Sequence, residues 1–462
     1  MKHTGCIHLD PATPTQAHNP SGKTQEAQDY HDLIDRLADQ VEQKVIEIRH
    51  DFHQHPELPN REFRTAKKIA EHLRSIGLDE VKTEVGVTGV VAVLEGGQPG
   101  DQCVALRADF DALPVKELAD VPFKSTVVDE DYPGGPFPVA HACGHETHAA
   151  MLMGAAEVLA QMRDRIPGRV KFLFQPAEEG PPVGEDGGAA MMVKEGALED
   201  PKPDIAFAIH SSPFPVNTLY YSEGDACAAS ELIKIEVKGM GVHGSTPWMG
   251  KDPLTVAAEI IVALGQISRQ VPATEAITIS IGKVDDTGRF NVIGDNITLW
   301  GTVRCIHQQV MADVNERIVR ISEHVAQAHG LTAEVSFDQT VPAIYNEPDW
   351  LSRILPTMER IFGHENMRSG PPMMAYDDHS VFQLACGGVY LLLGCQDTKW
   401  TDKGLEPIDP DKPIPFNHNP HFYVKDEVLK TGIRMHANVV MDFLTGKIQA
   451  EQALRSRSDY AS

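Results

Sequence analysis

The sequence predicts an α/β fold with a mainly parallel sheet, into which a smaller antiparallel domain is inserted. Two observations predict this class. Short apolar runs typical of buried strands alternate with helical segments, and a stretch in the middle of the chain follows the order βαββαβ. The chain has 462 residues, which is long enough for two or three domains, each with its own hydrophobic core.

The elements of the larger domain follow from hydrophobic periodicity. A first amphipathic helix is predicted because apolar residues recur at three- and four-residue spacing, at Leu33, Leu37, Val41, Val45 and Ile48. Further helices are expected at residues 63–76, 147–162, 350–362 and 428–443. Buried strands are expected at residues 90–94, 104–106, 170–174, 205–209 and 389–393. Ligand sites in such parallel sheets lie beyond the carboxyl ends of the strands.

The middle of the chain has a different pattern. Strands are predicted at residues 232–237, 277–281, 297–303 and 333–337, and helices at 253–268 and 310–329. The resulting order βαββαβ is typical of a ferredoxin-like unit. We therefore expect a domain at residues 225–338, inserted into a larger domain formed by residues 31–224 and 339–448. The polar segments 1–30 and 449–462 are expected to be a flexible arm and a flexible tail.

Composition excludes several classes of function. The chain has 41 basic and 66 acidic residues and a formal net charge of −25, which argues against binding to nucleic acid or to anionic lipid. No apolar run is long enough for a signal-peptide core or a membrane span. The seven scattered cysteines fit a reducing cytoplasm better than a disulfide framework. We therefore expect a cytoplasmic enzyme that acts on a small molecule.

The densest group of reactive side chains lies at residues 141–148, which have the sequence His-Ala-Cys-Gly-His-Glu-Thr-His. Residues two apart in an extended segment project to the same side, so Cys143 and His145 can face one metal ion. Thiolate and imidazole are ligands for zinc, nickel, cobalt or manganese-class ions. A Cys-x-His pair alone is equally compatible with a structural role.

Other polar residues follow the predicted strands. Glu178 and Glu179 come directly after the strand at 170–174, and His210 ends the strand at 205–209. One carboxylate of such a pair can bind a metal while the other moves a proton, which is a common way to hydrolyse an amide without a covalent intermediate. Acidic residues also follow the strand at 104–106, and His418 lies in a later loop. Together these groups indicate one site at the sheet edge.

The set of motifs resembles the di-metal metallopeptidase family of aminoacylases and glutamate-releasing carboxypeptidases. Within that family it is most similar to the amidohydrolase branch of hippurate, N-acyl amino acid and auxin-conjugate hydrolases. The resemblance extends over residues 32–445. It rests on these ordered motifs: Arg49-His50-x-x-His53-x-x-Pro56-Glu57, Leu106-Arg107-Ala108-Asp109, His141-Ala142-Cys143-Gly144-His145, Phe174-Gln175-Pro176-Ala177-Glu178-Glu179-Gly180, Gly239-x-Gly241-x-His243, Asn291-Val292-Ile293, Gly301-Thr302-Val303-Arg304 and His418-Asn419-Pro420.

The resemblance implies a metallopeptidase catalytic domain with two divalent ions per subunit, of Mn, Zn, Co or Ni. Glu178 is implied as the general base and acid for a metal-activated water. Asp111 resembles an Asp that supports the ligands without being one, although Asp109 stands where the wider family's H-x-D element has His. The implied metal ligands are Cys143, His145, Glu179, His210 and His418.

The resemblance also assigns roles to the inserted domain. It would be a lid and dimerisation domain, so that the protein is expected to form a homodimer or a higher homo-oligomer. His243 resembles a histidine that reaches the reacting carbonyl, commonly across the dimer. Asn291 and Arg304 match positions that grip the free carboxylate of the substrate, for which the planar guanidinium fork of arginine is well suited. The implied reaction is hydrolysis of N-acyl amino acids.

Two departures from the family pattern and three alternatives complete the prediction. Glu146 stands where relatives usually have Asp, and Ala375-Tyr376-Asp377-Asp378-His379 replaces Gly-Ser-Glu-Asp-Phe, which bears on specificity more than on reaction type. We expect His379 to pack in the interior. The alternatives are a dipeptidase or carboxypeptidase with the same site, a hydrolase with Cys143 as nucleophile, and an inactive binding subunit. All the implied ligand positions are filled, which argues against the last.

Overall fold

The computed structural model describes residues 21–448, with side chains from Tyr30 onward. Its first element, helix α1 (Ser21–Gln54), begins within the segment 1–30 that the sequence assigns to a flexible arm. Residues 1–20, which include Cys6, and the expected tail at 449–462 lie outside the described residues.

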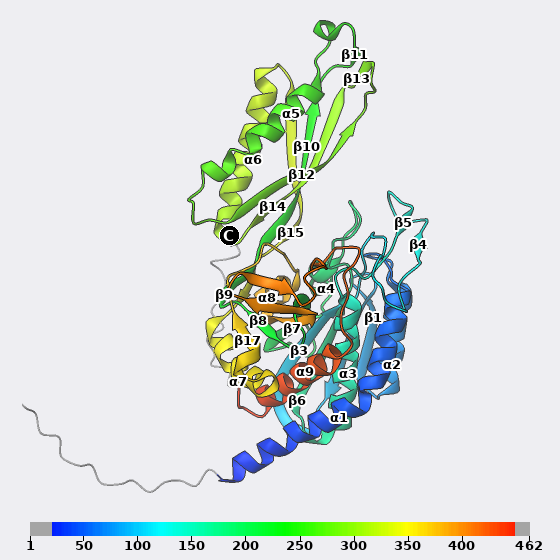
Figure 1. Cartoon of the computed structure of the whole chain (residues 1–462), viewed down its shortest axis with the longest axis vertical. Coiled ribbons are helices and arrows are strands. Elements are labelled where there is room, and N and C mark those ends of the chain that lie inside the picture. The colour runs from blue at the N-terminus through cyan, green and yellow to red at the C-terminus, as the bar shows by residue number, and fades with distance from the viewer. Residues whose placement is uncertain (1–20, 449–462) are drawn as a thin grey trace, which may run out of the picture.

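A mixed sheet of eight strands forms the centre of the larger part of the molecule (Figure 1). Its four central strands run parallel, whereas β1 and β2 join one edge in antiparallel pairing. In spatial order the strands are β1 (Glu80–Val85), β2 (Gly89–Glu95), β6 (Pro167–Gln175), β3 (Gln98–Asp109), β7 (Ile205–Pro215), β18 (Gly388–Gln396), β8 (Leu219–Tyr221) and β17 (Met367–Ser369). The mainly parallel central sheet predicted from the sequence is therefore present.

Helices cover both faces of this sheet and bury it, as a parallel sheet requires. One face packs against α1, α3 (His145–Gln161) and α9 (Val428–Leu444), with α2 (Phe63–Ser75) and α7 (Pro348–Phe362) beside them. The other face carries α4 (Gly188–Lys194) and α8 (His379–Cys386). Helix α3 is almost entirely buried, and a Cβ at its Gly154 would lie 2.7 Å from Ile433 and 2.8 Å from Val45. Glycine therefore permits the close packing of α1, α3 and α9.

A second, four-stranded antiparallel sheet lies at the other end of the molecule (Figure 1). Its strands, in spatial order, are β12 (Ile277–Asp286), β14 (Asn296–Cys305), β10 (Ala229–Lys238) and β15 (Thr332–Val341). Helices α5 (Pro253–Leu264) and α6 (Gln308–Ala328) pack on it and enclose a separate hydrophobic core. The chain enters and leaves beside the pair β9 (Gly224–Cys227) and β16 (Ile344–Asn346).

The remaining strands are short. A two-residue pair, β11 (Val242–His243) with β13 (Val292–Ile293), lies at the far tip of the small sheet (Figure 1). The other short strands are β4 (Val128–Asp129), β5 (Phe137–Pro138), β19 (Thr398–Thr401) and β20 (Gly404–Pro407).

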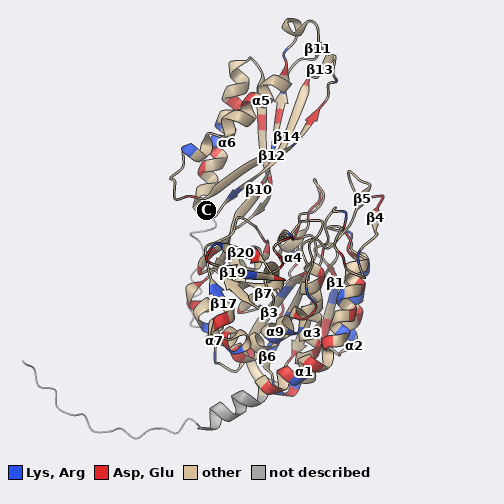
Figure 2. Ribbon diagram, in the orientation of Figure 1, with Lys and Arg blue, Asp and Glu red and all other residues tan. Residues whose placement is uncertain are grey.

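The distribution of acidic residues and cysteines can be described for residues 30–448. Acidic residues are spread over the helices of the large sheet and over the small sheet (Figure 2). The six described cysteines are all free and buried. Between residues 21 and 448, no helix combines the length and the apolar character that crossing a membrane would need.

Candidate metal centre

The polar residues that follow the parallel strands meet at one edge of the large sheet. Asp109 ends β3, Glu178 and Glu179 follow β6, and His210 lies in β7. His145 is the first residue of α3, and the preceding Gly144 has φ of 90°, a left-handed conformation that glycine adopts without strain. Adjacent parallel strands end side by side, which explains why residues distant in sequence converge here.

His145 is oriented by an aspartate behind it. Its Nδ1 lies 3.0 Å from Oδ1 of Asp111, and the other oxygen of Asp111 accepts a 3.0 Å hydrogen bond from the backbone N–H of Glu179. A carboxylate only accepts, so Nδ1 carries the proton and Nε2 is left with its lone pair. That Nε2 is buried and lies 3.7 Å from Oε2 of Glu178. Metal-binding histidines are usually held in this way.

His210 is held in a similar way. Its Nδ1 donates to the backbone carbonyl of Ser211 at 2.8 Å, and its Nε2 lies 3.6 Å from Sγ of Cys143. His418 approaches from the loop opposite, with Nε2 3.0 Å from Oε1 of Glu179. Donor atoms of Cys143, Glu179 and His418 all lie within 4.8 Å of one another. The structure thus brings the five implied ligands into one cluster.

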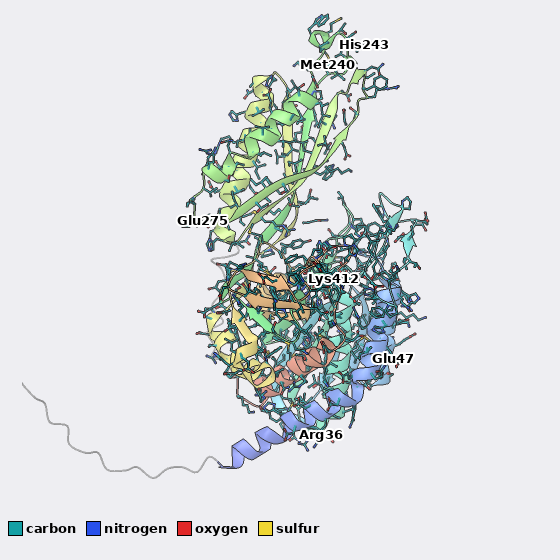
Figure 3. The ribbon with its side chains drawn as sticks, in the orientation of Figure 1. Arg36, Glu47, Met240, His243, Glu275 and Lys412 are labelled. Atoms are coloured by element: carbon teal, nitrogen blue, oxygen red, sulfur yellow. The ribbon has the colours of Figure 1, made fainter. Side chains whose placement is uncertain are left out.

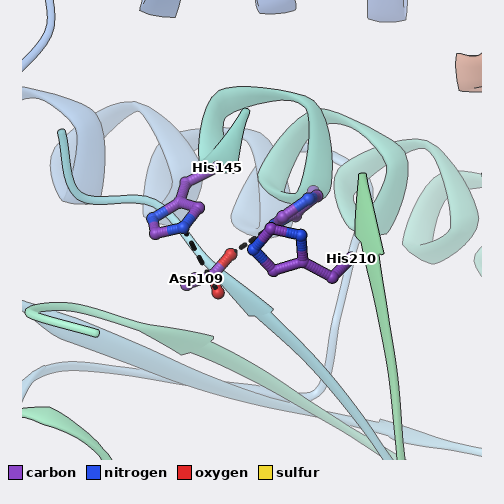
Figure 4. A group of neighbouring side chains, drawn as sticks. Asp109, His145 and His210 are labelled. Carbon is purple, nitrogen blue, oxygen red and sulfur yellow. Dashed lines mark hydrogen bonds and ion pairs between the residues drawn. The ribbon is translucent and has the colours of Figure 1, made fainter. Parts of the chain in front are cut away.

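This cluster fits divalent cations. His145 Nε2 and Glu178 Oε1 are buried without a hydrogen-bond partner among the described residues. Although burial opposes protonation of His145, the negative charges of Asp109 and Cys143 raise its pKa well above the ordinary value. The surroundings of Nε2 therefore favour a positive charge, which a metal ion bound to the Nε2 lone pair would supply in place of a proton. Figure 4 shows how closely Asp109, His145 and His210 approach. A mixed set of sulfur, nitrogen and carboxylate donors suits Mn, Zn, Co or Ni.

Two further pKa shifts bear on the chemistry of the cluster. Burial alone would raise the pKa of the Cys143 thiol, but His145 and His210 lower it well below its usual value. This shift favours the thiolate, the form of cysteine that binds metals. Burial, together with the charges of Asp377 and Glu179, raises the pKa of Glu178 well above the ordinary value. A carboxyl group with a raised pKa is suited to hold and release a proton.

A buried arginine supports this edge of the sheet, a role that the sequence analysis did not assign. Arg107 lies 2.9 Å from Oδ2 of Asp109, 3.0 Å from Asp377 and 3.1 Å from Asp378. It also donates to Gln175 at 2.8 Å. The donor atoms of Glu178, Asp377 and Asp378 are close enough for a metal site, but Arg107 already pairs with Asp377 and Asp378.

His148 also lies close enough to His145 and His210 to be a ligand, but both of its nitrogens are engaged. The backbone N–H of Ser211 donates to its Nε2 at 2.8 Å, so Nδ1 carries the proton and donates to Asp109 at 2.5 Å. His148 therefore positions the peptide next to His210. The sequence signal that could have identified His148 is its position in the segment 141–148, close to Cys143 and His145.

Glu62 holds the segment that carries Glu178. It accepts hydrogen bonds from Oγ1 of Thr88 at 2.6 Å and from the backbone N–H of Ala177 at 2.9 Å. Ala177 has φ of 52°, a left-handed conformation that costs a non-glycine residue energy, and this contact stabilises it. Burial and the charge of Asp111 raise the pKa of Glu62 to about 8. Nothing in the sequence pattern distinguished this glutamate.

Two of the residues at which the chain departs from the family pattern, Glu146 and His379, are buried. Glu146 accepts hydrogen bonds from Arg49 at 3.1 Å and from His53 at 2.8 Å. It anchors the start of α3 and lies outside the metal cluster. His379 is fully buried and its ring stacks on Tyr390 with centroids 6.0 Å apart, which is the packing predicted from the sequence.

The three predicted substrate contacts lie in two different places. Arg304 lines a cleft of about 710 Å³ together with Glu178, Glu179 and His418. His243, in contrast, is exposed at the far tip of the small sheet, as Figure 3 shows. Asn291 lies beside it, because its carbonyl accepts a 2.9 Å hydrogen bond from the N–H of Gly244. Within one chain, the structure brings Arg304 to the cluster but not His243 or Asn291.

Comparisons with known proteins agree with this geometry. The chain is 35% identical over 419 residues to thermostable carboxypeptidase 2 of Saccharolobus solfataricus, covering 89% of this chain and 99% of that protein. It is 32% identical over 415 residues to hippurate hydrolase of Campylobacter jejuni, again covering 89% of this chain and 99% of the relative.

A solved structure and a family description extend this likeness. A Bacillus subtilis protein, named as a dinuclear metal binding peptidase from the M20 family, has a TM-score of 0.68 and 27% identity, covering 88% of this chain and 99% of that one. The sequence model of peptidase family M20/M25/M40 matches residues 105–442. These likenesses lead to one conclusion: the chain belongs to peptidase family M20/M25/M40.

Proposed function

We propose that this protein is a metal-dependent amidohydrolase that cleaves N-acyl amino acids into an acyl group and a free amino acid. The observation that carries the proposal is the position of Glu178, buried beside five metal-type donors in a cleft that also contains Arg304. Relatives named hippurate hydrolase and N-acetyl-L-cysteine deacetylase support the class of reaction.

The proposed centre holds two divalent ions, of Mn, Zn, Co or Ni, through Cys143, His145, Glu179, His210 and His418. Such ions, when bound, polarise a carbonyl group and make a water molecule more acidic. Glu178 takes the proton of the attacking water and delivers it to the leaving amine. Asp111 keeps the His145 ring in the orientation that this task requires.

Arg304 supplies the selectivity for a free carboxylate. Its Nη1 donates to the carbonyl of Met374 at 2.9 Å, which fixes the guanidinium beside the cleft. A planar guanidinium binds a carboxylate through two parallel hydrogen bonds. The free carboxylate of an N-acyl amino acid therefore has a cationic partner near the scissile amide.

We assign His243 and Asn291 to the site of a second copy. In this proposal residues 225–338 form a ferredoxin-like lid and dimerisation domain, and residues 31–224 with 339–448 form the catalytic domain. The edge strand β12, which pairs with β14 on one side only, supports the assignment, as does a row of exposed apolar residues on α5 formed by Leu254, Ile261 and Val262. The free, buried cysteines support a reducing, cytoplasmic location.

A dipeptidase or carboxypeptidase is the second candidate, and the relative named thermostable carboxypeptidase 2 favours it. The experiment that decides is a panel of N-acetyl, N-benzoyl, long-chain acyl and indole-acetyl amino acids, together with dipeptides, each assayed with defined metals. We expect the acyl amino acids to be the better substrates. Amine release from dipeptides alone would overturn the first choice.

The same preparation tests whether Cys143 is a nucleophile. If the metal route is correct, a chelator abolishes activity and added Mn²⁺, Co²⁺, Ni²⁺ or Zn²⁺ restores it. Activity that survives the chelator but not thiol alkylation would support the covalent route. An inactive binding subunit would hydrolyse nothing in either assay.

A further inference from the structure

Tyr376 is a cleft residue to which neither the fold nor the ligand set assigns a role. It lines the same cleft as Glu178, Glu179, His418 and Arg304. It lies in the segment where this sequence departs from the family pattern, at the position usually occupied by serine. The departure replaces a small side chain with a large aromatic one that carries a hydroxyl group.

The backbone around Tyr376 is firmly held. The carbonyl of the preceding Ala375 accepts a 2.8 Å hydrogen bond from the N–H of Ala228. The following Asp377 is bound by the buried Arg107 at 3.0 Å and also accepts a hydrogen bond from the N–H of His379 at 2.8 Å. A side chain anchored on both sides has a defined direction, which is what a group that recognises a substrate needs.

The two ends of the Tyr376 side chain face different partners. The guanidinium of Arg304 lies over the ring, 4.8 Å from its centroid. The same side chain lines the cleft beside Glu178 and Glu179, which places it on the wall next to the metal cluster. Within residues 30–448 the hydroxyl forms no hydrogen bond, so its proton is available to a molecule bound in the cleft.

We propose that Tyr376 is a substrate-contacting catalytic residue, whose ring fixes Arg304 and whose hydroxyl donates a hydrogen bond to the amide carbonyl oxygen. That donation becomes stronger as the oxygen gains negative charge during attack on the amide. The phenol keeps its proton throughout, and no bond to it is made or broken. This inference rests on the proposed amide hydrolysis. It adds a second hydrogen-bond donor for the carbonyl oxygen, which comes from the same chain as Glu178, whereas His243 would come from a second copy.

The proposal gives the ring and the hydroxyl of Tyr376 different roles, and two variants test these roles separately. Tyr376→Phe keeps the ring under Arg304 and removes only the hydroxyl. We expect kcat for an N-benzoyl amino acid to fall about 100-fold, the usual cost of one lost donor to a developing oxyanion, with KM nearly unchanged. Tyr376→Ser restores the family residue and removes both parts, so KM should also rise about tenfold as Arg304 loses its aromatic support.

A binding measurement gives a second readout that a structural role would not change. A phosphinate analogue of the substrate resembles the tetrahedral state, whereas the free amino acid product does not. Tyr376→Phe should weaken the analogue about 100-fold and leave the affinity for the amino acid unchanged. Tyr423→Phe, which removes a hydroxyl that pairs with Asp397 at 3.3 Å, is the matched control and should behave as the wild type.

Each result of these experiments either supports or overturns the proposed role of Tyr376. Wild-type kinetics and wild-type analogue affinity for Tyr376→Phe would overturn the proposal, as would loss of bound metal in this variant. If Tyr376→Ser raised KM while Tyr376→Phe had no effect, the hydroxyl would have no catalytic role, which also overturns it. A wild-type enzyme that neither cleaves acyl amino acids nor binds the phosphinate would instead refute the proposed function.

Discussion

The metal cluster and the tip of the small sheet differ in almost every physical respect, although the sequence predicts that both serve one site. At the cluster, buried side chains of Glu178 and His145 meet partners from several strands at 3 to 4 Å. At the tip, His243 is exposed and its Nδ1 pairs only with the nearby Ser245 at 2.7 Å. The cluster is complete in one chain, whereas the tip lacks a partner surface within residues 21–448.

This difference shows what brings residues that are distant in sequence to one site. Several residues in and around the cluster lie at the ends of adjacent strands, since Asp109 ends β3 and Glu178 and Glu179 follow β6, so hydrogen bonding between strands sets their separation. The tip belongs to another sheet with its own hydrophobic core, and the chain connects the two parts only beside β9 and β16. A residue on such a separate unit reaches a distant site only through a domain movement or through a second chain.

The largest expected effect is on the cluster side of the comparison. Glu178→Gln removes the group that moves the proton but keeps the size of the side chain. We expect kcat to fall about 1000-fold or more while the metal content is unchanged. Steady-state kinetics and metal analysis of the same sample measure both. Glu71→Gln on the exposed side of α2 is the control, and an active, metal-replete Glu178→Gln enzyme would refute the role.

The next effect concerns metal binding itself. Cys143→Ala removes one of the donors grouped with Glu179 and His418. We expect metal affinity to fall at least about 100-fold and activity to fall with it. Competition with a chelating dye measures the affinity. Cys305→Ala, which removes a buried thiol from the small sheet, should keep the metal, and equal losses in both variants would argue against a specific site.

The tip is tested by mixing two inactive variants. If His243 acts in the partner's cleft, a heterodimer of Glu178→Gln and His243→Ala contains one complete site out of two. Random pairing then restores about a quarter of the wild-type activity. If His243 acts within its own chain after the lid moves, mixing restores none. Separately assayed variants provide the background, and size-exclusion chromatography verifies that the chains exchange.

The smallest expected effect is on the pH dependence of stability, and it compares a buried histidine, His436, with an exposed one, His364. Burial, with a smaller contribution from His148, lowers the pKa of His436 to about 3, below the ordinary value of 6.5. The unfolded chain therefore binds the proton more readily, and stability is lost as the pH falls below 6.5 toward 3. In urea unfolding the slope should be up to about 1.4 kcal/mol per pH unit from this group.

Two variants isolate that contribution. His436→Leu should flatten the stability profile between pH 6.5 and 5 relative to the wild type, whatever its effect on absolute stability. His364→Leu, at a side chain that is 92% exposed, should leave the profile unchanged. A wild-type slope in His436→Leu would show that this histidine is not neutral in the folded protein.

Much of the fold could be predicted because hydrophobic periodicity is a local property. The strand expected at 205–209 corresponds to β7 (Ile205–Pro215), and the helix expected at 428–443 to α9 (Val428–Leu444). The short strands β8 and β17 were not predicted, because three residues carry too little periodicity. In the cluster, residue type and spacing made Cys143 and His145 candidates, and the family resemblance implied them as ligands.

The supporting residues could not be predicted from pattern. Arg107 and Asp377 are 270 positions apart, and their pairing depends on how β3 and the segment before α8 meet. The protonated nitrogen of His148 follows only from the neighbouring N–H of Ser211, which belongs to another strand. Such contacts are set by the positions of the strands in space, which no local sequence signal encodes.

The sequence by itself determined the alternation of elements, the metal-binding types of side chain and the place of Glu178 and Glu179 directly after a buried strand, since these depend on residues close together in the chain. The predicted end of the strand before His210 was wrong, because β7 continues to Pro215. Only the tertiary structure decided that the implied ligands converge, that Arg107, His148 and Glu62 hold them, and that His243 lies apart. The physical reason is that side-chain geometry at a strand end depends on neighbouring strands, and the position of a separate core depends on the connection between the two parts.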